Sequence, residues 1–130
     1  MPPSFAIALM MNNYLHDVAT ALLASSAVAL WVLLRRYEAG PRGAEAARYF
    51  LEVQRAMVKL ARLSLAWIVL GGIPRTIWYA DFEWANAAGR GQVAALAVKH
   101  VVAFVLVGFG IVFWRRLQAR VRAVEAGLRR

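Results

Sequence analysis

The chain contains two histidines, His16 and His100, and each lies in or beside a strongly apolar stretch. Two cations share that setting, since Lys99 directly precedes His100 and Arg75 follows the run WIVLGGIP. Ionisable side chains are costly at membrane depth and usually mark a functional site there. Imidazole suits metal ligation and proton transfer, whereas guanidinium and ammonium groups suit the binding of anions. These four residues are therefore the candidates for chemistry.

The stretches that carry these residues are long enough to cross a membrane. Of the 130 residues, 62% are hydrophobic, a fraction well above that of ordinary soluble domains. Residues 13–34, 63–80 and 92–114 form three apolar runs, each close to the roughly 20 residues that a membrane-spanning helix needs. We therefore predict one all-α domain, an integral membrane bundle of three transmembrane helices with helical cytoplasmic extensions.

The basic residues predict the orientation of this bundle. Seven of the sixteen lie between the first two predicted spans, and six more follow the third. The positive-inside rule then places both regions in the cytoplasm and the N-terminus outside. No basic segment precedes the first span, so we expect it to be retained rather than cleaved as a signal peptide. The net charge of +9 is therefore distributed as in a multi-pass protein of the inner (cytoplasmic) membrane, in contact with the lipid bilayer. It does not indicate that the protein binds nucleic acid.

Turn residues divide the helices. The segment EAGPRG (Glu38–Gly43) predicts the end of the first helix, because glycine and proline terminate helices. A second helix is expected to begin near Ala44 in the cytoplasm and to run without interruption into the membrane. The segment GRGQ (Gly89–Gln92) predicts the turn into the third helix. We expect that helix to continue beyond the membrane in the basic tail, and residues 1–11 to lie outside the first span.

Helix geometry predicts similar depths for the candidate residues. At 1.5 Å per residue from the basic boundary of each span, His100 lies at about 22 Å, Arg75 at about 20 Å and His16 at about 28 Å. A modest tilt brings the three levels together. Because the first and third spans run in the same direction, the two histidines can face each other across the bundle.

Two facing imidazoles on parallel membrane helices are the arrangement that a bis-histidine haem b requires. We predict His16 and His100 as the iron ligands, with Arg75 and Lys99 neutralising the haem propionates. The chain has no cysteine, which excludes thiolate ligands and covalent haem attachment. Other interpretations stay open: each histidine could hydrogen-bond to a neighbouring helix, Arg75 and Lys99 could extend to the surface, and Met10, Met11 and His16 could bind copper(I).

The order of motifs resembles a known group of membrane proteins. YLHDVA in the first span, RLSLAWIVLGG in the second and GQVAALAVKHVVAFVL in the third resemble small proteins of the copper-resistance-D and HemJ-like group over about residues 13–114. The resemblance implies a bound b-type haem or porphyrin, with His16 as an axial ligand and Lys99 or His100 at the second position. HemJ-type proteins usually have a fourth span, and that departure puts protoporphyrinogen oxidation in doubt.

These observations lead to one preferred function and two alternatives. We predict a membrane b-type cytochrome subunit that transfers electrons between the quinone pool and a redox partner. We expect such an electron-transfer subunit rather than a stand-alone enzyme. A homodimer, or other membrane or periplasmic redox subunits, would complete the bundle around the haem. The alternatives are a haem-free anchor or assembly subunit of a larger complex, and a HemJ-like protoporphyrinogen oxidase.

Overall fold

The computed structural model describes residues 2–41 and 43–129, apart from the side chain of residue 82. The regular elements of this part are all helical, and they follow in the order α1 (Pro3–Ala39), α2 (Ala44–Ile77), a π-helix η1 (Ala80–Trp84), α3 (Ala85–Gly89) and α4 (Val93–Leu128). The helices α1, α2 and α4 are each long and apolar enough to cross a membrane. The predicted fold class, an all-α bundle of three membrane helices, is confirmed.

The predicted helix breaks are confirmed. The first helix ends at Ala39, and α2 runs without interruption from Ala44 to Ile77. The second turn precedes α4 and includes Gly91, whose φ of +67° is the left-handed conformation that glycine adopts without strain. The helix α1 begins at Pro3, well before the predicted span, because proline fits the first helical turn, where its missing N–H is not needed.

The three long helices meet in an apolar core at the basic end of the bundle. Each contributes two buried residues, and these are Leu30, Leu34, Phe50, Leu51, Leu117 and Val121. The rings of Tyr37 and Phe50 stack with centroids 5.0 Å apart, and Arg120 on α4 forms an ion pair with Glu38 on α1. This end of α4 is thereby fixed to both other helices.

A seam of small residues joins α1 and α2 farther along their length. Ala19 and Ser26 on α1 and Ala61, Ser64 and Gly71 on α2 are all buried. Small residues allow close approach of membrane helices, where packing replaces the hydrophobic effect as the driving force.

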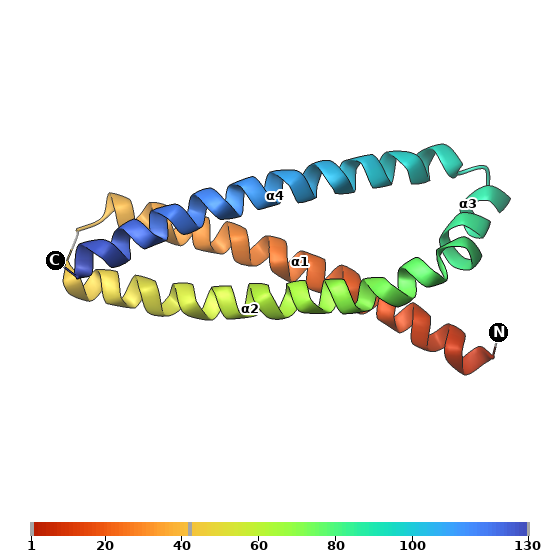
Figure 1. Cartoon of the computed structure of the whole chain (residues 1–130), viewed down its shortest axis with the longest axis horizontal. Helices are drawn as coiled ribbons and strands as arrows, with labels where there is room; N and C mark the ends of the chain where they lie inside the picture. The colour runs from red at the N-terminus through yellow and green to blue at the C-terminus, as the bar shows by residue number, and fades with distance from the viewer. Residues whose placement is uncertain (1, 42, 130) are drawn as a thin grey trace.

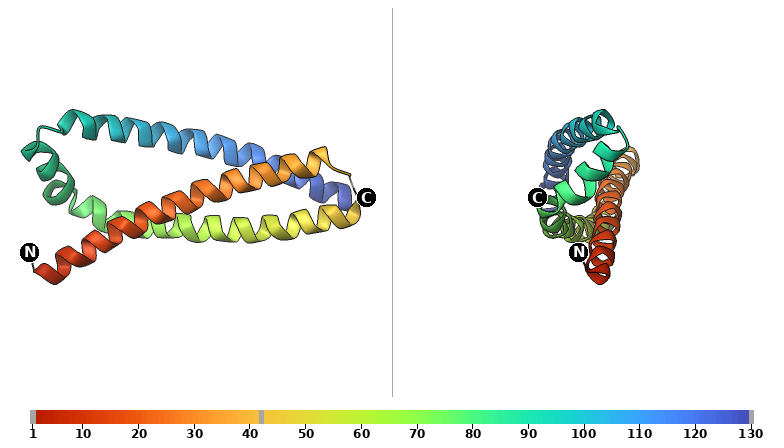
Figure 2. Two further views of the ribbon diagram at one scale, coloured as in Figure 1. Left: turned by 180° about the vertical axis from the view of Figure 1, so that it is seen from behind. Right: turned by 90° about the vertical axis from the view of Figure 1, so that its right-hand side faces the viewer.

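The helix α4 diverges from the other two toward the opposite end of the bundle (Figures 1 and 2). None of its most apolar stretch is buried, and the side chains of Phe104 and Phe109 are 76% and 68% exposed. The elements η1 and α3 bridge the gap between the end of α2 and the start of α4 (Figure 1). The three helices therefore form a narrow wedge, with its wide end at the predicted outer surface.

Candidate functional site

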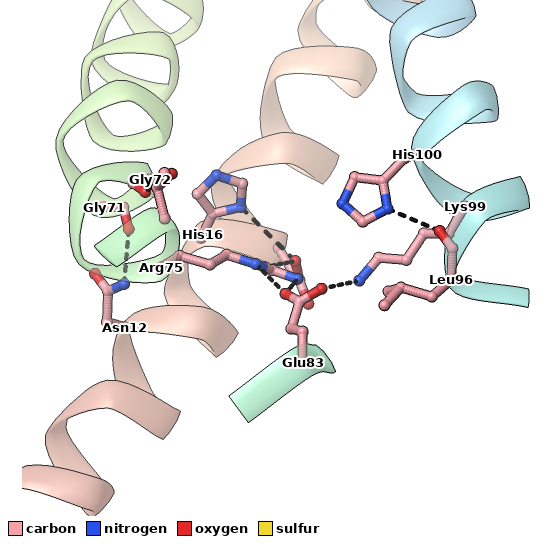
Figure 3. Close-up of polar contacts among 11 residues, drawn as sticks. Asn12, His16, Gly71, Gly72, Arg75, Glu83, Leu96, Lys99 and His100 are labelled. Carbon is pink, nitrogen blue, oxygen red and sulfur yellow. Dashed lines mark hydrogen bonds and ion pairs between the residues drawn. The ribbon is translucent and has the colours of Figure 1, made fainter. Parts of the chain in front are cut away.

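The four candidate residues gather near the wide end of this wedge (Figure 3). His16 comes from α1, Arg75 from the last turn of α2, and Lys99 and His100 from the second turn of α4. Figure 3 shows the two imidazole rings on either side of the space between α1 and α4, with the ion pairs of Arg75 and Lys99 beside them. The structure thus brings to one level the two histidines that the sequence predicts as a pair.

His100 is held in one tautomer by its own helix. Its Nδ1 lies 2.7 Å from the carbonyl oxygen of Leu96, and a carbonyl only accepts, so Nδ1 carries the proton. The edge of the imidazole also contacts the ring of Tyr79, with centroids 5.6 Å apart. In the neutral imidazole the lone pair then lies on Nε2, the nitrogen that can bind a metal.

His16 is one-fifth exposed and incompletely paired. Its Nδ1 is buried, makes no hydrogen bond to any residue that the structure describes, and lies 3.8 Å from a carboxylate oxygen of Asp17. On the α2 side, a Cβ built on Gly72 would lie 3.9 Å from the His16 Nε2, an ordinary contact distance. A buried nitrogen without a hydrogen bond costs stability, and function is a common reason to retain one.

The cations beside the histidines are engaged by carboxylates. Arg75 donates to Glu83 Oε1 at 2.6 Å and to Asp17 Oδ1 at 3.2 Å, while the Lys99 ammonium lies 3.1 Å from Glu83 Oε2. The four residues form a chain of ion pairs, Asp17–Arg75–Glu83–Lys99, that connects α1, α2, η1 and α4. The two end residues, Asp17 and Lys99, are adjacent in sequence to His16 and His100. The chain of ion pairs therefore positions α1 and α4, the helices that carry the two histidines.

Glu83 is the central acceptor of this chain. Its side chain is only 15% exposed and accepts from both cations. Burial raises the pKa of this carboxyl, but the hydrogen bond from Lys99 and the charge of Arg75 outweigh burial and hold the pKa below its ordinary value of 4.5. Glu83 is therefore ionised at neutral pH and binds both cations at once.

Sequence reasoning missed Glu83 as a partner. It assigned Arg75 and Lys99 to the haem propionates, and Glu83 was not among its candidate residues. The missing information is the π-helical turn after α2, which carries Glu83 back toward Arg75 eight residues earlier. Asp17 pairs with Arg75 and is 73% exposed.

Other metal chemistry has less support within the described residues. Among them, no three His, Asp or Glu side chains converge as ligands. Met10 and Met11, the alternative copper(I) ligands, are both exposed on α1.

Comparisons of the chain with models of protein families, with curated protein sequences and with solved structures found no match. The functional argument therefore depends on the geometry of this site.

Proposed function

We propose that the protein is a membrane b-type cytochrome whose haem iron is bound by His16 and His100. One observation carries the proposal: the two histidines of the chain lie at one level on α1 and α4, where α4 stands away from its neighbours (Figure 3). The hydrogen bond to Leu96 leaves the Nε2 of His100 available. The resemblance to the copper-resistance-D and HemJ-like group supports the same cofactor.

Haem b bound at this level would supply one-electron transfer. The residues of the chain would set its environment: the Leu96 carbonyl orients the His100 imidazole, the Tyr79 ring restricts its movement, and Asp17 lies 3.8 Å from the His16 Nδ1. We propose the quinone pool as one redox partner because Trp78, Tyr79 and Trp84 lie in the segment from the end of α2 to the end of η1, at the depth where a quinone head group would enter. A second redox subunit, or a second copy of this chain, would cover the exposed face of α4.

The role of Arg75 and Lys99 toward the propionates is a second, separable part of the proposal. Both cations bind Glu83, so a propionate would have to share or replace that carboxylate. The ion-pair chain alone gives the two residues a sufficient function, because it connects α4 to α1 and α2 beside the two histidines. Substitution of Glu83 separates the two roles and is taken up in the Discussion.

The haem assignment is tested by purification of the full chain from haem-replete membranes. We expect a reduced-minus-oxidised spectrum of b type and a pyridine haemochrome that yields haem in stoichiometric amount. His16→Ala and His100→Ala should each lose most of the haem, whereas Thr76→Ala should retain it, since Thr76 is exposed and bonds only to Gly72 in its own helix. Colourless wild-type protein, or equal haem in all four samples, would refute the proposal.

A haem-free anchor or assembly subunit is the second candidate. The observation that favours this function is that Arg75 and Lys99 both pair with Glu83 of the same chain. The two cations therefore do not need a haem propionate as a counterion. This function predicts colourless protein that co-purifies with other chains and histidine variants that weaken assembly. HemJ-like protoporphyrinogen oxidation would instead show as porphyrin turnover in membranes that contain the protein.

A further inference from the structure

A cavity of about 480 Å³ lies between α2 and α4 at the basic end of the bundle, far from the histidines. Three of its lining residues are cations on one face of α2, Arg55, Lys59 and Arg62, since positions four and seven residues apart share a helix face. The carboxylate of its lining is Glu125, which leaves a net charge of +2. The cavity is therefore suited to an anion.

The cations of this cavity are not neutralised by the protein. Among the described residues, the ion pairs involve other side chains, and none includes Arg55, Lys59 or Arg62. All three side chains are exposed, so water screens part of their mutual repulsion, and an anion between them would remove the rest. At the opposite end of the bundle, in contrast, Arg75 and Lys99 both bind Glu83.

A buried donor independently indicates a ligand. Gln118 of α4 lines the same cavity, and its Nε2 is buried without a hydrogen-bond partner in the part of the chain that the structure describes. A buried amide donor costs free energy until it meets an acceptor. A rotation of the Gln118 side chain would bring this amide to a phosphate oxygen in the cavity, where the three cations also donate.

The level of the cavity distinguishes a lipid from a soluble phosphate. Arg62 is the last basic residue before the apolar part of α2, and Leu63, which follows it and lines the cavity, is 61% exposed. Lys59 lies one turn, about 4.5 Å, below Arg62. Cations at this depth coincide with the phosphates of the adjacent leaflet, and the exposed Leu63 is placed to contact an acyl chain.

We propose that this cavity binds the phosphate head group of one anionic phospholipid from the leaflet at the basic end of the bundle. Arg55, Lys59 and Arg62 bind the phosphate oxygens, and Gln118 donates to one of them. The lipid thereby connects α2 to α4 on the side opposite the Glu38–Arg120 ion pair of α1 and α4. This site is independent of the haem proposal, because it shares no residue with the histidine region.

Native mass spectrometry of the full chain in detergent tests the proposal, with phosphatidylglycerol and phosphatidylcholine added separately. We expect one retained phosphatidylglycerol and little phosphatidylcholine. The double variant Lys59→Gln/Arg62→Gln should weaken retention by at least about tenfold, since each cation near an anionic lipid contributes roughly fivefold. The matched control Arg48→Gln/Arg116→Gln removes the same charge outside the cavity and should bind within about twofold of wild type.

A second variant and a second probe complete the test. Gln118→Leu keeps every charge and should still weaken retention, which a general attraction of basic residues for anionic lipid would not explain. Equal loss in the Arg48/Arg116 control, or equal retention of both lipids, would overturn the site. Inorganic phosphate that stabilises the protein against heat as well as phosphatidylglycerol does would overturn the lipid assignment.

Discussion

At the scale of single residues, the central feature is one carboxylate that binds two cations from two membrane helices. Glu83 accepts from Arg75 and Lys99, and its removal would leave Arg75 with Asp17 alone and Lys99, which is 56% exposed, without its protein counterion. We expect Glu83→Gln to lower the free energy of unfolding by about 1 kcal/mol, measured as a loss of thermal stability in detergent. Glu45→Gln, at an exposed position at the start of α2, is the control and should change stability little.

The same variant separates the two roles of the cations. If they serve mainly to position α4, Glu83→Gln should loosen this end of the bundle and reduce haem retention. If they bind propionates, the loss of Glu83 should leave haem retention intact or improve it. The pyridine haemochrome yield of Glu83→Gln, compared with that of the Glu45→Gln control, distinguishes these roles.

Glu83 also predicts the pH dependence of stability. Its pKa in the folded protein lies below the ordinary value of 4.5, so the folded state binds fewer protons than the unfolded state between these two values. Its stabilising contribution is complete above about pH 4.5 and is lost as the pH falls through the folded pKa. The difference in melting temperature between wild type and Glu83→Gln should therefore be constant near neutrality and shrink below about pH 4.5. A difference that grows with acidification would contradict this assignment.

The chemistry-bearing residues could be selected from the sequence, but their partners could not. His16 and His100 are conspicuous because polar residues in apolar runs are expensive, and helix rise alone places them at similar depths. Their hydrogen bonds depend on rotamers and on the irregular turn at η1, which no periodic pattern encodes. The sequence therefore predicts the histidine pair and misses the Asp17–Arg75–Glu83–Lys99 chain.

At the scale of elements, the seam between α1 and α2 depends on close backbone approach at Gly71. The Asn12 amide donates to the Gly71 carbonyl at 2.8 Å, and a Cβ at Gly71 would lie only 3.0 Å from the Asn12 Oδ1. Hydrogen bonds between membrane helices average about 0.6 kcal/mol, with a maximum near 1.7. We expect Gly71→Ala to cost roughly that amount by displacing Asn12.

Gly72 offers a matched control for this substitution. A Cβ there meets only the His16 Nε2, at 3.9 Å, so Gly72→Ala should leave the unfolding free energy nearly unchanged. Reversible unfolding in mixed micelles measures both variants. Equal destabilisation by the two alanines would show that general crowding, rather than the Asn12 contact, governs the seam, because alanine favours a helix over glycine.

The turn between α1 and α2 and the start of α4 follow from the sequence, because glycine or proline lies in both turns, whereas the start of α1 at Pro3 and the η1 segment after Ile77 do not. The divergence of α4 does not follow from it. An apolar membrane helix gains little from packing against other helices rather than lipid, so hydropathy alone leaves its angle undetermined. The core around Phe50 and Leu117 fixes α4 at one end, and the η1–α3 bridge sets its separation at the other.

At the scale of the whole molecule, the orientation predicted from the basic residues can be tested with single cysteines, because the chain has none. A Cβ at Gly89, in the loop predicted outside, or at Gly127, near the predicted cytoplasmic end, meets no atom within 4 Å. In intact cells, Gly89→Cys should react with a membrane-impermeant maleimide, whereas Gly127→Cys should react only after permeabilisation. The reverse pattern would invert the topology.

The haem proposal connects these scales, since it requires the two histidines, the positioning chain of ion pairs and the wedge opened by α4. Its most direct test is the electron paramagnetic resonance spectrum of the oxidised, purified protein. The proposal predicts a low-spin signal of bis-imidazole type that His100→Gly abolishes and that free imidazole restores to this variant. Haem-free protein, or a signal that is identical in wild type, His16→Gly and His100→Gly, would contradict it.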